Sequence, residues 1–119
     1  MNKILSCVAV AVVSVFSTSD SFAGRKEGPL GNQYTVEAKS ENLFSAVFRD
    51  GQPAIVIVKG TSGDIDCVVM DQKTNPVAKD FRPKISACML TWNPIWEGVF
   101  HVGIVNDGDE PVTYTLTTN

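Results

Sequence analysis

The chain has 119 residues, of which 44% are hydrophobic and 19% charged, and its formal net charge is −3. This length fits one small domain. The charged residues form no basic stripe, which argues against a nucleic-acid partner, and no basic amphipathic helix, which argues against binding to anionic membrane surfaces.

The first 23 residues have the three regions of a secretory signal peptide. Lys3 supplies the positive charge, residues 4–16 form a Val-rich apolar run, and Ser21 and Ala23 suit cleavage after Ala23. The apolar run is too short to span a bilayer as a helix. We therefore expect an exported protein, periplasmic or secreted, with no membrane insertion after removal of the signal. The alternative is a retained N-terminal anchor.

The exported part is expected to be all-β. Residues 24–33 are rich in glycine and charge, and we expect a flexible leader there, followed by a domain over residues 34–119. Short apolar runs separated by turn residues then predict about seven strands of a small antiparallel β-sandwich, jelly-roll-like in character. The expected strands cover residues 44–49, 54–59, 65–70, 77–80, 85–92, 99–105 and 112–117. Residues 40–48 also fit one face of a helix, so a short helix before residue 44 remains an alternative.

Cys67 and Cys88 are the two cysteines that follow the signal segment. In an oxidising compartment an isolated pair most simply forms a disulfide bond, worth about 3 kcal/mol for a loop of this length. With His101 as the one histidine they would make a poor zinc site, and they lack the C-x-x-C spacing of redox enzymes.

The alternation of side chains along a strand predicts which residues face the core. The candidates are Ile65, Cys67, Val69, Cys88, Leu90, Trp92, Phe100, Val102, Ile104, Tyr114 and Leu116. Both cysteines therefore lie on apolar faces, as an internal bridge requires.

Three pieces of the sequence resemble the bacterial pre-peptidase C-terminal (PPC) domain, a small secreted β-sandwich. They are DGQPAIVIVKGTSGDIDCVVMD at residues 50–71, TWNPIWEGVFHVGIVN at residues 91–106 and YTLTTN at residues 114–119. The resemblance runs from about residue 48 to the end. It implies an accessory domain of the kind attached to exported enzymes, some of which bind calcium. We expect a stand-alone version with no enzyme domain before it, which departs from the family pattern. The cysteine pair is a second departure, because it is not general in that family.

Acidic residues around the third expected strand are candidate calcium ligands, because calcium prefers several carboxylate and carbonyl oxygens. The candidate set is Asp64, Asp66, Asp71 and Asp80. The alternative is that these residues are solvated and discourage pairing between sheet edges. A second acidic cluster, at residues 107–110, is more simply a hairpin turn.

No convincing catalytic group is present, so we expect no enzyme activity. His101 would need a nucleophile and an orienting acid, and nothing in the sequence places Ser86, Thr91 or Thr113 beside it.

The expected function is a binding or accessory module for a protein or extracellular polymer. Trp96 and Trp92 are its candidate contact residues, although a rim contact on the sandwich would also explain Trp96. The alternatives are an inhibitor or structural protein acting on an exported protease through residues 71–85, and, less favoured, a small hydrolase that uses His101.

Overall fold

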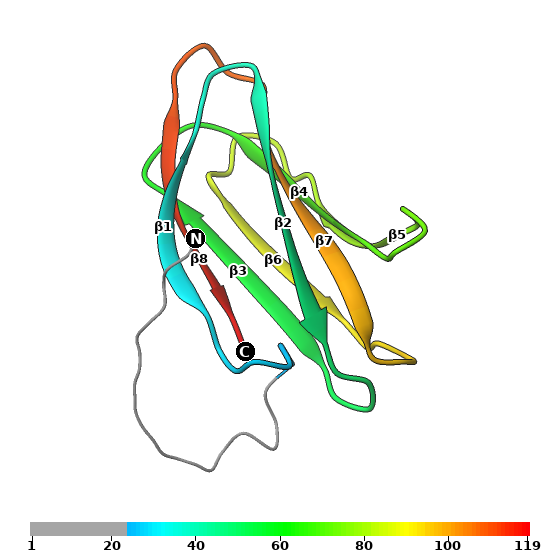
Figure 1. Ribbon diagram of the computed structural model, residues 1–119. Coiled ribbons are helices and arrows are strands. Elements are labelled where there is room, and N and C mark those ends of the chain that lie inside the picture. The colour runs from blue at the N-terminus through cyan, green and yellow to red at the C-terminus, as the bar shows by residue number, and fades with distance from the viewer. Residues whose placement is uncertain (1–23) are drawn as a thin grey trace.

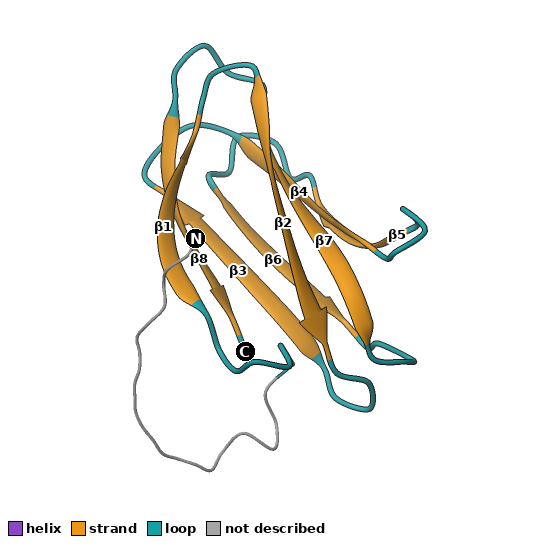
Figure 2. Ribbon diagram, in the orientation of Figure 1, coloured by secondary structure: helices purple, strands orange, loops and turns teal. Residues whose placement is uncertain are grey.

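The computed structural model describes residues 24–119, and the predicted signal peptide lies outside them. The described residues form eight β-strands and no helix (Figures 1 and 2). No helix capable of crossing a membrane therefore occurs among them. The strands are β1 (Gly31–Val36), β2 (Ser40–Phe48), β3 (Ala54–Gly60), β4 (Ile65–Met70), β5 (Pro76–Asp80), β6 (Ala87–Trp92), β7 (Gly98–Asn106) and β8 (Val112–Thr118).

The strands form two four-stranded antiparallel sheets packed face to face. One sheet has the order β1-β8-β3-β6 and the other has the order β2-β7-β4-β5. Each of the first four strands pairs with a partner from the second half of the chain: β1 with β8, β2 with β7, β3 with β6, and β4 with β5. This is the strand order of an eight-stranded jelly roll. The predicted β-sandwich is confirmed.

The alternative of a helix before residue 44 is wrong, because residues 40–48 form one continuous strand. Strand β2 pairs with β7 from Ser40, opposite Asn106, to Phe48, opposite Gly98. Phe44 and Phe48 point into the sandwich, whereas Leu43 is 60% exposed on the opposite face. The apolar residues that suggested a helical face are thus divided between the two faces of a strand.

Strand β1 begins at Gly31, three residues before the expected start of the domain at Tyr34. The preceding residues hydrogen bond to the sandwich rather than forming a separate leader. The backbone N–H of Arg25 donates to the carbonyl oxygen of Asn119 (3.0 Å), and that of Lys26 donates to the carbonyl oxygen of Val47 (2.7 Å). Backbone pairing does not depend on apolar side chains, so the polar composition of this segment concealed it.

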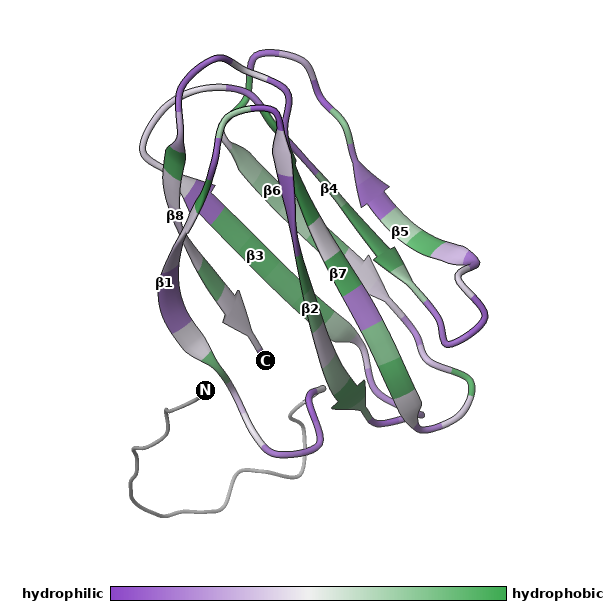
Figure 3. Cartoon of the chain, turned by 45° about the horizontal axis from the view of Figure 1, so that its top comes forward, coloured by the Kyte–Doolittle hydropathy of each residue, from purple (hydrophilic) through white to green (hydrophobic). Residues whose placement is uncertain are grey.

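Every predicted core residue is buried between the two sheets. Figure 3 shows hydrophobic colour along β3, β4 and β7 and hydrophilic colour concentrated in the loops. The predicted disulfide bond is confirmed: Cys67 on β4 and Cys88 on β6 are bonded with their Cα atoms 6.2 Å apart. Because β4 and β6 belong to different sheets, the bond joins the two layers.

Aromatic side chains pack at one end of the core, where Phe48 lies against Trp92 and Phe100, with ring centroids 4.9 and 6.1 Å away. Elsewhere in the core, the hydroxyl of Tyr114 accepts a hydrogen bond from Asn42 Nδ2 (2.8 Å). Burial raises the pKa of Tyr114 to about 12, so this phenol stays neutral.

Candidate functional site

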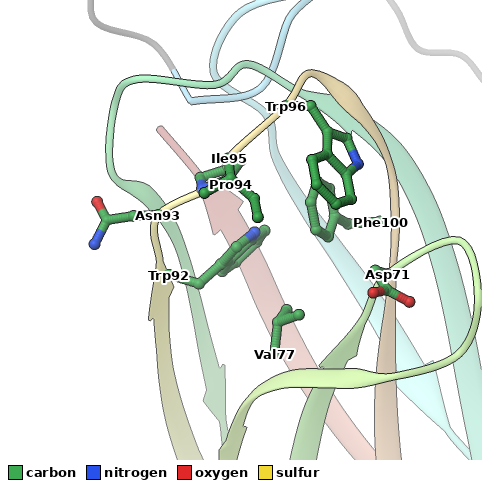
Figure 4. Close-up of a pocket in the computed structure, with 8 residues that line it drawn as sticks. All are labelled: Asp71, Val77, Trp92, Asn93, Pro94, Ile95, Trp96 and Phe100. Atoms are coloured by element: carbon green, nitrogen blue, oxygen red, sulfur yellow. The ribbon is translucent and has the colours of Figure 1, made fainter.

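A pocket of about 490 Å³ opens at the end of the sandwich closed by Trp92 (Figure 4). Its volume lies in the range of about 300–1,000 Å³ that is usual for small-ligand sites. The lining is mostly apolar and comes from the β4–β5 turn, strand β5, the β6–β7 loop and strand β7. The residues are Asp71, Val77, Trp92, Asn93, Pro94, Ile95, Trp96 and Phe100.

The loop between β6 and β7 forms the outer wall of this pocket. Asn93 and Pro94 end strand β6, since proline cannot donate a ladder hydrogen bond. The carbonyl oxygen of Pro94 accepts a bond from the N–H of Gly51 (3.4 Å), which ties the loop to the β2–β3 turn. Ile95 and Trp96 are left 79% and 60% exposed. Two large apolar side chains at the mouth of a pocket are a candidate contact surface.

The floor of the pocket includes Trp92, which is only 7% exposed. Its ring centroid lies 5.4 Å from that of Phe100. Among the described residues no hydrogen-bond partner exists for its buried Nε1 atom. A buried donor without a partner costs about 1–3 kcal/mol. In Figure 4 the nitrogen-bearing edge of the indole faces Pro94 and Ile95.

Asp71 is the charged residue of the pocket. Its Oδ1 atom accepts hydrogen bonds from the backbone N–H groups of Lys73 and Asn75, both at 2.9 Å, while Oδ2 has a longer contact of 3.4 Å with Asn75 Nδ2. The backbone bond from Asn75 is the largest cause that lowers the pKa of Asp71. The carboxylate is therefore ionised at neutral pH and stabilises its own turn.

The structure does not bring the four predicted calcium ligands together. Asp64 precedes β4 and Asp71 follows it, so at about 3.3 Å per residue the two lie roughly 20 Å apart. Asp71 therefore cannot share an ion with Asp64. Within residues 24–119, no group of three or more histidine, cysteine or carboxylate side chains has the arrangement of a metal site.

Asp64 and Asp66 instead lie near Asp107, with which they line a hollow of about 170 Å³. Burial, followed by repulsion from Asp64 and Asp107, raises the pKa of Asp66. Sequence spacing did not indicate that Asp107 lies beside Asp64 and Asp66. Strand pairing explains it, because Ile65 lies opposite Asn106 and the residues just beyond this pair must meet.

Asp80 has a structural role. Its carboxylate accepts two hydrogen bonds from the Arg82 guanidinium, at 2.8 and 2.7 Å, and one from the backbone N–H of Met89 (2.9 Å). Met89 lies on β6, an outer strand of its sheet, so Asp80 satisfies an N–H group on an open edge. The bonds from Arg82 are the main reason that the pKa of Asp80 is lowered to about 2.

Replacing Asp80 with Asn should lower the free energy of unfolding by about 2 kcal/mol at pH 7. The ordinary pKa is 3.8, so the stabilisation is complete above that pH and is lost as the pH falls toward 2. Urea unfolding of both proteins at pH 7 and pH 2 measures the effect, with Asp50→Asn as an exposed control. An equal difference between the two proteins at both pH values would contradict the assignment.

His101 is paired with a serine that the sequence did not single out. Ser45 lies opposite it on β2, and Ser45 Oγ is 2.6 Å from His101 Nδ1. The neighbour of His101 on its other side is Met70 of β4. A catalytic triad would need a carboxylate in that position to orient the histidine. Thr91 and Thr113 belong to the other sheet. The geometry is that of a cross-strand hydrogen bond on the outer face of the β2-β7-β4-β5 sheet.

No protein-family model matches this chain, and a search of curated proteins found no match.

Proposed function

We propose that this protein is an exported, non-catalytic binding module that recognises a protein or polymer partner through the pocket beside Trp96. The observation that carries the proposal is the exposure of Ile95 and Trp96 at the mouth of that pocket. Exposed aromatic residues beside a pocket commonly dominate binding energy. The loops of a rigid sandwich are also the usual place for recognition residues.

Export is supported by two independent features. Residues 1–23 have the composition of a signal peptide, and the bond between Cys67 and Cys88 is consistent with an oxidising compartment. Together they favour the periplasm or the medium. A stand-alone PPC domain, which the sequence motifs suggested, would suit an accessory role in either place.

Inhibition of an exported protease is supported less well. An inhibitor presents a rigid exposed loop to the enzyme, and residues 71–85 contain the exposed Phe81 and the basic residue Arg82. The guanidinium of Arg82, however, is held by both carboxylate oxygens of Asp80. A protease pocket that took this side chain would have to break both bonds.

Affinity capture from native envelope and culture extracts tests the proposal. The oxidised protein should retain a specific partner, and Trp96→Ala should abolish most of that retention. Leu43→Ala is the matched control, because Leu43 is also 60% exposed but lies on the outer face of β2. Retention that is unchanged by Trp96→Ala would refute the assigned surface.

The same capture, run with calcium and with a chelator, tests the acidic residues. Calcium-dependent retention that Asp66→Asn removes would support a cation role for the hollow beside Asp64 and Asp107. Equal retention in both buffers would support structural and solubility roles for these carboxylates.

A further inference from the structure

We propose that the pocket binds a neutral polysaccharide, with a sugar ring stacked on Trp96 and sugar hydroxyls bonded to Trp92 and Asp71. This inference rests on the proposed binding function and names its ligand class. It depends on three features of the pocket: a flat exposed ring, a buried donor without a partner, and an ionised acceptor.

The exposed indole of Trp96 supplies an apolar platform. The C–H groups on the faces of a sugar ring are weakly polar, and they suit the electron-rich face of an aromatic ring. An indole has few rotatable bonds, so holding it against a ligand costs little conformational entropy. Pro94 restricts the backbone of the same loop through its fixed φ angle.

The indole N–H of Trp92 supplies the donor. It is buried beside the pocket and has no hydrogen-bond partner among the described residues. A ligand oxygen placed there would recover a hydrogen bond that folding leaves unmade. The nitrogen-bearing edge faces the buried Pro94 and also Ile95, whose side chain is 79% exposed, so a change of the Ile95 rotamer is the movement that would let a ligand oxygen reach it.

Asp71 supplies the acceptor. Its Oδ1 atom is already engaged by two backbone N–H groups, but within residues 24–119 Oδ2 has only the 3.4 Å contact with Asn75 to compete with a ligand hydroxyl. The same hydrogen bonds keep the carboxylate ionised, and a fixed negative charge repels acidic polymers. A hydroxyl group both accepts and donates, so the hydroxyl groups of a neutral sugar match the Trp92 donor and the Asp71 acceptor alike.

An extended peptide fits these features less well. Peptides that bind a β-sandwich through their main chain usually add a strand to an open sheet edge. Loops line much of this pocket, and the Met89 N–H on the nearby edge of β6 is already bonded to Asp80. Strand β5, at the edge of the other sheet, begins with Pro76, which has no N–H to offer.

Retention of the oxidised protein on insoluble neutral polysaccharides tests the inference. The probes are cellulose, chitin, xylan and mannan, with alginate as the acidic comparison. We expect retention on at least one neutral polymer and weak retention on alginate. Trp96→Ala should weaken binding at least about tenfold, and Trp92→Phe, which keeps a ring but removes the donor, should weaken it severalfold. Leu43→Ala should bind like the original protein.

Folding of each variant is checked by urea unfolding before binding is compared. If Trp92→Phe is unfolded, Asp71→Ala replaces it as the test of the polar contacts. Failure to bind any of the neutral polymers would overturn the polysaccharide inference, as would binding that Trp96→Ala leaves unchanged. If the protein bound no neutral polymer but still captured a protein partner through Trp96, only the ligand class would be wrong. If it bound neither a polymer nor a protein partner, the proposed function would be refuted as well.

Discussion

Removing the disulfide bond by replacing Cys67 and Cys88 with alanine should lower the free energy of unfolding by about 3 kcal/mol or more. The bond joins β4 to β6 and thus the two sheets, and it restricts a long loop of the unfolded chain. A domain of this size has a modest core, so this loss is a large part of its total stability. Urea unfolding with and without dithiothreitol measures it.

The double variant, with alanine at positions 67 and 88, also serves as the control for the effect of dithiothreitol. Dithiothreitol should destabilise the original protein and leave the double variant unchanged, because the variant has no bond to reduce. Both sulfur atoms are buried, so alanine leaves a small cavity, and the variant should be slightly less stable than the reduced protein. A reduced protein as stable as the oxidised one would contradict this account of the fold.

Replacing Asn106 with aspartate should destabilise the protein by about 3–5 kcal/mol at pH 7. Asn106 is 1% exposed, and its Nδ2 atom donates to the carbonyl oxygens of Val36, Glu37 and Glu110 at 3.4, 3.2 and 2.7 Å. Aspartate has nearly the same shape, but it would place a negative oxygen against three carbonyl oxygens. The substitution therefore removes the donors without changing the packing.

The effect of Asn106→Asp should depend on pH. Burial and the facing carbonyl oxygens would raise the pKa of the new carboxyl group, so protonation in acid should restore part of the lost stability. Urea unfolding at pH 7 and pH 4 measures this recovery. Asn32→Asp, at an exposed position of β1, is the matched control and should change stability little. A small effect of Asn106→Asp at pH 7 would show that this side chain does not organise the loops around it.

Local sequence patterns predicted the middle of the sandwich well. Strand β4 was expected at residues 65–70 and has those bounds, because alternating apolar residues and flanking turns both mark it. Strand β1 was missed, because none of the expected strands covers residues 31–36. It is an edge strand, and its polar residues, such as Asn32 and Gln33, carry no apolar signal. Its position is instead fixed by pairing with β8, which lies at the far end of the chain.

The candidate site could be predicted only in part for the same reason. Trp92 and Trp96 are close in sequence, and the proline between them marks a loop. Asp71 and Val77 reach the pocket because β4 and β5 pack beside β7, which is a property of the jelly-roll topology. Asp107 similarly joins Asp64 and Asp66 only through strand pairing. The spacing of these residues in the sequence predicts neither of these two spatial contacts.

Photocrosslinking at Ile95 shows whether the pocket beside Trp96 is the recognition surface. Photo-leucine in place of Ile95 puts a reactive group at the pocket mouth without removing Trp96, and photo-leucine in place of Leu43 puts the same group on the outer face of β2. Both proteins would be irradiated in native envelope and culture extract. We predict a covalent adduct with a specific partner or polymer from position 95 and none from position 43. Adducts from position 43 alone would refute the assigned surface and place recognition on the outer face of the sheet.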